Sequence, residues 1–541
     1  MNTPAAVELA ATDHGPIAGA RHAVPLTFRM AWPYWLPPAL LALGLTFLFL
    51  NPFIGDWDGL DYTVLSVRGY PSSMGLGRAL FIFFNHSLYR IAHTVFGVPA
   101  SNAYLIFKYA VVVAGPLAVI ACWTLARDLT KSVHSATVAA LLVAVSPVFI
   151  LYSGQVMTDV PSVLLLAIVL TVYLRGAQRR NSWLMFAGAA LLGAGVNVRE
   201  TAAFYAPWLV IAPLVSGWKI KRREIALVGM VVVAFLVAAL GAFACWLILD
   251  PAYRLAWHNW LLSMHDEAAR HPVTLRNALP FLVYFFLTAP LVFMALPVAA
   301  WKEWRAHGLS PLLACAAVGL MSNFLLFFNY STAVNWRYFL TGLPALAPLV
   351  AAYFVSSETK RLGSLRRGFT SAILGSLLIP ALMGIFIQPK SSDYFNKLAL
   401  AKDYQTRLSL LPRDAVVMAG SQTVAVTYWR GIGAGDWDAI GIGGGWPGER
   451  LVPVIEQYLK SGRRVFLDAD QHWWQPCGWR LKELPELIKL ESRFHFQRVS
   501  ETIFEIKDVN DATARDKPAL EQLLPENRPE DVKRCFNVKT E

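Results

Sequence analysis

Apolar stretches close to membrane-crossing length recur along this chain and constrain its fold more than any other feature. We place eleven of them, at 38–52, 104–126, 136–152, 160–174, 183–197, 201–216, 225–249, 279–300, 309–329, 338–356 and 369–387. Only 16% of the residues are charged, against about a quarter in soluble domains. Because a helix crosses a bilayer with about 20 apolar residues, the sequence predicts a polytopic α-helical membrane protein with about eleven transmembrane helices.

The cations between these stretches predict which way the helices run. In the eleven-helix arrangement, one side of the membrane receives Arg21, Arg29, Arg127, Lys131, Arg175, Arg179, Arg180, Lys219, Lys221, Arg222, Arg223, Lys302, Arg305, Lys360, Arg361, Arg366 and Arg367. That side is predicted to be the cytoplasm, because cytoplasmic loops carry an excess of Lys and Arg. The N-terminus is then cytoplasmic and the C-terminal region extracytoplasmic, which we expect in a bacterial inner (plasma) membrane. These loops account for much of the net charge of +12, so no nucleic-acid partner is needed.

The chain divides at a change in composition. Residues 1–389 hold the apolar stretches and a long first outer loop, 53–103, whereas residues 390–541 are polar and rich in charge. Strand-like and helical patterns alternate in this tail, at 415–418, 450–461, 464–467, 481–490 and 493–507. We therefore predict a soluble extracytoplasmic α/β domain after the transmembrane domain. A disulfide between Cys477 and Cys535 in this tail is one alternative in an oxidising compartment.

Three carboxylates follow the first apolar stretch directly, in Gly55-Asp56-Trp57-Asp58-Gly59-Leu60-Asp61-Tyr62. One interpretation is that these acids cap a short helix at the membrane surface, as Asp often does. The other is a general base, because a partly desolvated carboxylate can accept a proton from an attacking hydroxyl. On the second interpretation, the candidate catalytic residues are Asp58 and Asp56.

Further polar residues fall on the same outer side. Asp159 opens the fourth stretch, where it either interacts with the helix dipole or belongs to the same site as Asp58. Arg199 stands alone between two short stretches. Its guanidinium either binds a donor phosphate or pairs with Glu200. Arg337 repeats this situation at the start of the tenth stretch.

A basic face is predicted on the helix over 78–98. His86, Arg90 and His93 share that face by their spacing of four and three residues. These side chains either hold a lipid phosphate at the membrane surface or provide ordinary attraction to headgroups.

The second outer loop, 250–278, contains possible metal ligands in no compact metal motif. They are His258, His265, Asp266, Glu267 and His271. No cofactor is therefore expected, and a divalent metal is not indicated, although the sequence leaves metal dependence open.

These motifs resemble those of the GT-C integral membrane glycosyltransferases. Trp57-Asp58-Gly59-x-x-Tyr62 followed by Gly69-Tyr70 resembles the first-loop motif of that superfamily. Asn85-His86-Ser87-Leu88-Tyr89 resembles a segment of its protein-mannosyltransferase and aminoarabinose-transferase branches. Weaker similarities lie in Met157-Thr158-Asp159-Val160-Pro161, Arg199-Glu200-Thr201-Ala202 and Arg337-Tyr338-Phe339-Leu340. The resemblance covers roughly residues 35–390.

The resemblance implies inverting transfer of a hexose or pentose from a polyprenyl-phosphate donor to a lipid, glycan or protein acceptor on the non-cytoplasmic face. By position, it makes Asp58 the general base and Asp159 a second acidic site residue. The donor-phosphate ligands would be Arg199, Arg90 and His86, with Arg337 as a further candidate. Arginines suit that role because the departing phosphate spreads its charge over its oxygens.

Two other classes of protein remain open. Charges within the membrane and broken helices suit a transporter or lipid flippase, although the acids gather at one surface and no repeated half is visible. A membrane-anchored assembly protein, with the tail as its working part, is the third interpretation. Replacement of Asp58 separates these classes, because only an enzyme would lose turnover while it keeps lipid binding.

Overall fold

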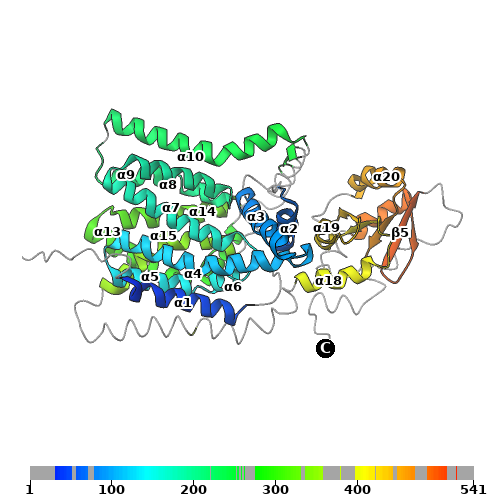
Figure 1. Ribbon diagram of the computed structural model, residues 1–541, viewed down its shortest axis with the longest axis horizontal. Helices are drawn as coiled ribbons and strands as arrows, with labels where there is room; N and C mark the ends of the chain where they lie inside the picture. The colour runs from blue at the N-terminus through cyan, green and yellow to red at the C-terminus, as the bar shows by residue number, and fades with distance from the viewer. Residues whose placement is uncertain are drawn as a thin grey trace, which may run out of the picture.

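A bundle of long helices adjoins a smaller unit built on a β-sheet, and two shorter helices lie between them (Figure 1). The computed structural model describes residues 31–50, 57–70, 78–219, 221–251, 253–254, 257–258, 261, 275–329, 336–356, 378, 397–420, 422–442, 448–469, 484–508 and 520. Several predictions concern residues outside this part of the chain, namely Asp56, the possible ligands His265, Asp266, Glu267 and His271, the pair Cys477 and Cys535, and almost all of the stretch 369–387.

The helices of the bundle occupy the first ten apolar stretches. They are α1 (Trp32–Leu48), α4 (Ala103–Thr130), α5 (Val133–Ala144), α6 (Pro147–Tyr152), α7 (Asp159–Arg179), α8 (Ser182–Val196), α9 (Trp208–Val215), α10 (Arg222–Leu249), α12 (Leu275–Thr288), α13 (Pro290–His307), α14 (Pro311–Asn329) and α15 (Leu343–Ser356). In the described residues, four helices are long and apolar enough to cross a membrane, or five if one bent pair counts as a span. Eleven transmembrane helices therefore remain a prediction.

The stretch 279–300, predicted as one helix, is broken in the structure. The chain bends by 100° between Phe281–Thr288 and Pro290–His307. Ala289 has φ −152° and ψ 79°, outside the helical region. The cause is Pro290, because a proline disfavours helical backbone at the residue before it and starts a new helix readily.

Short capped turns fold the helices back on one another. The side chains of Ser132, Ser146 and Asn181 each accept a hydrogen bond from a backbone N–H in the first turn of the following helix. The stretches 183–197 and 201–216 form separate elements, α8 and the 3₁₀ helix η3 (Glu200–Tyr205) followed by α9. The turn between them carries Arg199, as the charge distribution predicted.

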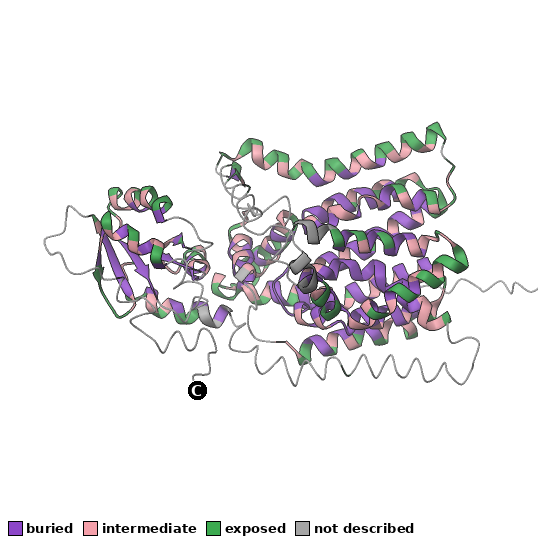
Figure 2. Cartoon of the chain, turned by 180° about the vertical axis from the view of Figure 1, so that it is seen from behind, coloured by how far each residue is buried: buried purple, intermediate pink, exposed green. Residues whose placement is uncertain are grey.

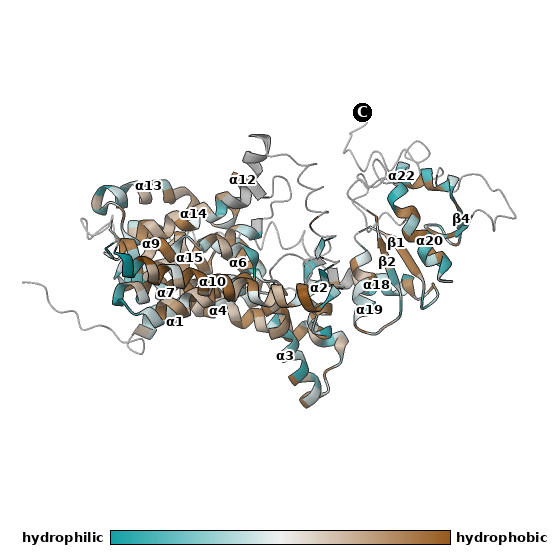
Figure 3. Ribbon diagram, turned by 90° about the horizontal axis from the view of Figure 1, so that it is seen from above, coloured by the Kyte–Doolittle hydropathy of each residue, from teal (hydrophilic) through white to brown (hydrophobic). Residues whose placement is uncertain are grey.

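The bundle is buried inside and apolar on much of its outer surface. Figure 2 shows the buried residues in the interior and a largely exposed α10 at one edge. Exposed side chains of α10 include Val233, Val237 and Ile248. Figure 3 shows that the helices of the bundle are mostly hydrophobic along their length. Such a surface suits contact with lipid, because apolar side chains have no hydrogen bonds to lose when lipid tails surround them.

The tail forms a five-stranded sheet with order β2-β1-β3-β5-β4. The central β1 pairs in parallel with β2 and β3, whereas β5 runs antiparallel to both β3 and β4. In chain order the elements are α18 (Lys397–Leu408), β1 (Val416–Ala419), α19 (Thr423–Gly431), β2 (Asp438–Gly441), α20 (Val452–Lys460), β3 (Val465–Asp468), α22 (Leu484–Ile488), β4 (Phe494–Arg498) and β5 (Ile503–Asp508).

The segment predicted as the first outer loop supplies the junction between bundle and sheet. It contains α2 (Trp57–Arg68) and α3 (Ala79–Phe96), and Figure 1 shows α2 beside α19. Leu60 and Val64 of α2 belong to the hydrophobic core of the sheet unit. Tyr62, which lies between them in sequence, belongs to the core of the bundle. Packing therefore ties α2 to both parts of the molecule.

Candidate active site

One acid–arginine pair joins α2 to the short helix that precedes α15. Asp58 lies in the first turn of α2, and Arg337 lies in the 3₁₀ helix η4 (Trp336–Gly342) that precedes α15. Arg337 Nη2 lies 2.7 Å from Asp58 Oδ2. The Arg337 side chain is 7% exposed and that of Asp58 is 25% exposed. Asp58 is therefore paired and still accessible from one side.

A second pair is more deeply buried. Asp159 is the first residue of α7, and Arg199 directly precedes η3. Arg199 Nη1 lies 2.6 Å from Asp159 Oδ1 and donates a hydrogen bond of 3.2 Å to Thr158 Oγ1. The side chain of Asp159 has no exposed surface, and that of Arg199 is 4% exposed. Each charge offsets the cost of burying the other.

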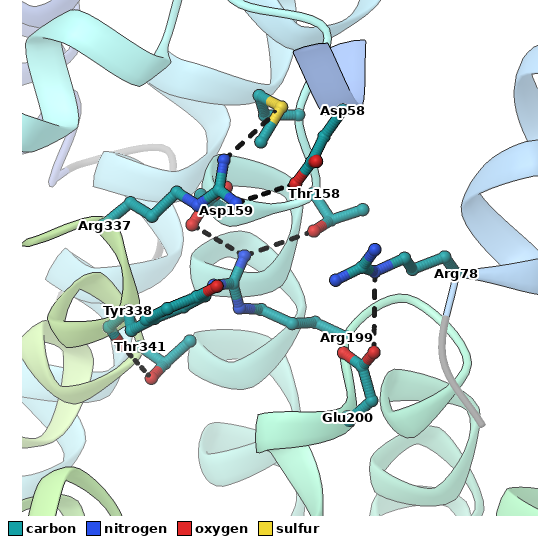
Figure 4. Close-up of polar contacts among 10 residues, drawn as sticks. Asp58, Arg78, Thr158, Asp159, Arg199, Glu200, Arg337, Tyr338 and Thr341 are labelled. Atoms are coloured by element: carbon teal, nitrogen blue, oxygen red, sulfur yellow. Dashed lines mark hydrogen bonds and ion pairs between the residues drawn. The ribbon is translucent and has the colours of Figure 1, made fainter. Parts of the chain in front are cut away.

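Both arginines lie against the ring of Tyr338 (Figure 4). The guanidinium carbon of Arg199 is 5.1 Å from the ring centroid, and that of Arg337 is 5.4 Å from it. Each distance falls within the range of a cation–π interaction. Arg337 Nη1 also donates to Met157 Sδ at 4.0 Å. Four segments singled out in the sequence thus meet at one place.

A third pair lies beside the first two. Arg78 Nε is 3.5 Å from Glu200 Oε1, and the guanidinium carbon of Arg78 is 5.3 Å from the ring of Tyr62. Figure 4 shows Arg78 and Glu200 close to Arg199. Glu200 was the alternative partner for Arg199, and the structure pairs it with Arg78 instead.

Sequence reasoning did not select Arg78 as a site residue. The available signal was a cation at the start of an apolar helix, on the predicted outer side, where cations are scarce. Tyr338 lies in the motif Arg337-Tyr338-Phe339-Leu340, where the sequence gives it no role of its own. A ring that binds two guanidinium groups leaves no signature in a single sequence.

The basic face of α3 has contacts of its own. His86 Nδ1 is 2.8 Å from the carbonyl oxygen of Ser66. The His86 ring also lies against Gly69, where the backbone has φ +68°. Arg90 is exposed. The role of these two side chains as phosphate ligands remains a prediction.

The arrangement is electrically balanced at its centre. Three arginines face three carboxylates in the pairs above. In the part of the chain that the structure describes, no group of three or more His, Cys, Asp or Glu side chains could hold a metal ion.

A cleft of about 250 Å³ opens between α2 and α19. It is lined by Asp58, Asp61 and Val64 on one side and by Thr423, Val424, Thr427 and Tyr428 on the other. Burial raises the pKa of Asp61 from its ordinary 3.8 to about 6, the nearby Asp58 carboxylate adds to the rise, and Arg78 opposes it. The cleft thus holds one carboxylate paired with arginine and one that is protonated in mildly acidic solution.

The family comparison matches part of the chain. Residues 86–264, about a third of the sequence, match the protein family described as dolichyl-phosphate-mannose-protein mannosyltransferase. No curated protein matches the chain.

Solved structures share the fold over most of the chain. The archaeal oligosaccharyltransferase AglB from Archaeoglobus fulgidus, in complex with an inhibitory peptide and a dolichol-phosphate, has a TM-score of 0.54 and 13% identity, over 90% of this chain and 75% of that chain. The same oligosaccharyltransferase with Zn and sulfate has a TM-score of 0.51 and 12% identity, over 88% and 73%. With a tethered acceptor peptide that contains the NVT sequon, it has a TM-score of 0.50 and 13% identity, over 89% and 74%. The family match and the shared fold confirm the predicted resemblance to the GT-C superfamily.

Proposed function

We propose that this chain, which has the fold of the GT-C membrane glycosyltransferases, transfers a hexose or pentose from a polyprenyl-phosphate donor to an acceptor hydroxyl on the non-cytoplasmic face. The observation that carries the proposal is the meeting of the Asp58–Arg337 and Asp159–Arg199 pairs at Tyr338. These residues come from segments that separately resemble GT-C motifs. The matched family and the dolichol-phosphate bound to AglB support a lipid-linked donor. The acceptor is a glycan, a lipid or a protein.

Arg199 and Arg337 are the proposed ligands of the donor phosphate. A guanidinium binds phosphate through two parallel hydrogen bonds, and the common contact with Tyr338 keeps the two guanidinium groups close together. Their positive charge would stabilise the phosphate as it departs. Asp159 has no exposed surface, so its proposed role is to hold Arg199 in position.

Asp58 is the proposed general base. As the acceptor oxygen bonds to the anomeric carbon, its proton passes to the Asp58 carboxylate. The bond from that carbon to the phosphate oxygen breaks, and the phosphate leaves with the electron pair. A single displacement of this kind inverts the configuration at the anomeric carbon.

The ion pair of Asp58 connects donor binding to this step. Arg337 contacts Asp58 at 2.7 Å in the structure. A donor phosphate would compete for the same guanidinium, because arginine binds carboxylate and phosphate with the same geometry. Binding of the donor would therefore release the Asp58 carboxylate to accept a proton.

Sugar transfer by the purified protein tests the proposal. We would measure transfer from synthetic polyprenyl-phosphate monosaccharides by the wild type, Asp58→Asn and Asp403→Asn. Asp58→Asn should lose about 10²–10⁴-fold in rate, the usual contribution of a general base, while donor binding persists. Asp403 is an exposed acid in α18, and its replacement should change neither quantity.

Two results would contradict the proposal. Equal transfer by the wild type and Asp58→Asn would exclude Asp58 as the base. Neither transfer nor donor binding by the wild type, across a broad donor panel, would favour the transporter or flippase interpretation.

A further inference from the structure

The cleft between α2 and α19 has polar groups at helical spacing on both walls. Asp58 and Asp61 are three residues apart on α2, and Thr423 and Thr427 are four residues apart on α19. These spacings place each pair on one face of its helix. The two faces enclose a space of about 250 Å³.

The hydroxyl groups of both threonines in this cleft already donate a hydrogen bond to a backbone carbonyl oxygen. Thr423 Oγ1 donates to the carbonyl oxygen of Gly420, and Thr427 Oγ1 donates to that of Thr423, each at 2.8 Å. Each hydroxyl can then only accept a further hydrogen bond. An ionised carboxylate is likewise an acceptor only. Among the described lining residues, the Tyr428 phenol is the one side chain that retains a donor in its ordinary state.

The chemistry of the cleft therefore selects its ligand. Most of the exposed lining of the cleft is apolar, and its few polar groups are mainly acceptors. A ligand that fits it brings hydrogen-bond donors together with an apolar face, and two neighbouring carboxylates disfavour an anionic ligand. We propose that this cleft is the acceptor subsite and takes a neutral, hydroxyl-rich acceptor, a sugar residue of a glycan, with Asp61 and Thr427 as positioning residues. This inference rests on the proposed glycosyl transfer.

The geometry of α2 explains how one sugar residue would use both carboxylates. Asp58 and Asp61 lie on the same face of the helix, so neighbouring hydroxyls of a sugar can reach both. One hydroxyl would lie at Asp58 for attack, and the next would donate to Asp61. The apolar face of the ring would pack on Val64 and Val424, which also line the cleft. A serine or threonine side chain has only one hydroxyl and would leave Asp61 unsatisfied.

Asp61 is available for such a bond. Among the described residues, its carboxylate makes no hydrogen bond or ion pair. Its pKa of about 6, raised by burial, predicts that affinity for the acceptor depends on pH. Titratable or charged groups near Asp61 or on elements packed against α2 include Asp58, Arg78, His86, Tyr104, Lys108, Arg337, Tyr404 and Tyr428. Of these, Asp58 and Arg78 act on Asp61 electrostatically.

Steady-state kinetics with a varied acceptor test the inference. The probes are a neutral alkyl disaccharide and the same disaccharide carrying a phosphate. Asp61→Asn and Thr427→Val should each raise the KM for the neutral acceptor about tenfold, the size expected for one lost hydrogen bond, with kcat changed less than threefold.

Thr406→Val is the matched control. Thr406 is an exposed threonine of α18 whose hydroxyl donates to the carbonyl oxygen of Asp403, as Thr427 does within α19, and it does not line the cleft. This variant should have the acceptor KM of the wild type. The pH profile adds a readout that a purely structural role would not change. The wild-type KM should fall as pH rises through about 6, and Asp61→Asn should abolish that dependence.

The outcomes separate this inference from the proposed function. If the wild type transfers sugar but the acceptor KM is unchanged in Asp61→Asn and Thr427→Val, the acceptor subsite lies elsewhere. Preference for the phosphorylated disaccharide would overturn the assigned acceptor chemistry. Absence of both transfer and donor binding in the wild type would overturn the proposed function, and this inference with it.

Discussion

At the scale of single residues, the two paired aspartates differ in exposure, and exposure decides what each can do. Asp58 is partly open to the cleft, so it can meet a substrate. Asp159 is completely buried, and neither of its carboxylate oxygens accepts a well-aligned hydrogen bond. Its burial is therefore compensated by the charge of Arg199 alone among the described contacts, and it acts through that arginine.

Removal of the Asp159 charge should destabilise the protein as well as inactivate it. Asp159→Asn leaves Arg199 buried without its counter-charge, a change that costs about 3–5 kcal/mol in buried pairs. We expect a lower apparent Tm in detergent and a loss of sugar transfer. The double variant Asp159→Asn/Arg199→Met removes both charges and should recover most of the Tm but none of the transfer.

A direct catalytic role for Asp159 would produce a different pattern. Asp159→Asn would then keep the Tm of the wild type and lose only its rate. Thermal unfolding of the single and double variants, measured beside transfer, distinguishes the two roles.

At the scale of secondary-structure elements, α2 is shared between two hydrophobic cores. Tyr62 packs in the core of the bundle, whereas Leu60 and Val64 pack in that of the sheet unit. The position of α2 therefore sets the position of both the proposed base, Asp58, and the acceptor cleft. Docking of α19 against α2 should consequently affect transfer.

Gly431 offers a test of that docking. A Cβ atom at this position would collide with the side chain of Val64, whose Cβ would lie 3.1 Å away. A β-branched side chain has few alternative rotamers, and overpacking typically costs about 1–3 kcal/mol. Gly431→Ala should therefore loosen α19 from α2, raise hydrogen exchange over residues 57–68 and reduce transfer about tenfold.

Gly441→Ala is the control for this substitution. Gly441 lies in the same unit, and an added Cβ there would meet nothing within 4 Å. This variant should behave as the wild type. Equal hydrogen exchange over α2 in all three proteins would show that the α2–α19 contact does not hold the first loop in place.

At the scale of the whole molecule, the site and a group of cations lie at opposite ends of the bundle. Asp159 and Arg179 mark the two ends of α7, about 30 Å apart at 1.5 Å per residue, which is about the thickness of the hydrocarbon core. Arg127, Lys131 and Arg175 join Arg179 around a polar cavity of about 680 Å³. By the positive-inside tendency, this end is the predicted cytoplasmic one.

Cysteine labelling checks this orientation. In a cysteine-free background, Gln178→Cys reports on the cationic end and Ser409→Cys on the sheet unit, both at exposed positions. A membrane-impermeant maleimide should label Ser409→Cys in intact cells and Gln178→Cys only after permeabilisation. The reverse pattern would invert the predicted topology, and labelling of both in intact cells would place both positions on one face.

The sequence by itself predicted most of the local structure and singled out most of the residues that the structure brings together in the candidate site. Ten apolar stretches lie where helices form, because a helix surrounded by lipid must be composed mainly of apolar residues. Asp58, Asp159, Arg199 and Arg337 could be found one at a time, because each is a charge that interrupts an apolar pattern. The strands near 415–418 and 464–467 correspond to β1 and β3, whose four residues are buried in each case. By contrast, α19 and β2 were missed, since their glycine-rich surroundings indicate loops.

Only the tertiary structure decided which partner each charge has. Asp58 and Arg337 are separated by 279 positions in sequence, and the pair exists because α2 and η4 pack on the same end of the bundle. Arg199 pairs with Asp159 rather than with its neighbour Glu200, and Glu200 forms an ion pair with Arg78. The cleft between α2 and α19 likewise depends on the docking of two distant helices. Periodicity and motifs are local properties, whereas the geometry of a site depends on how distant elements pack.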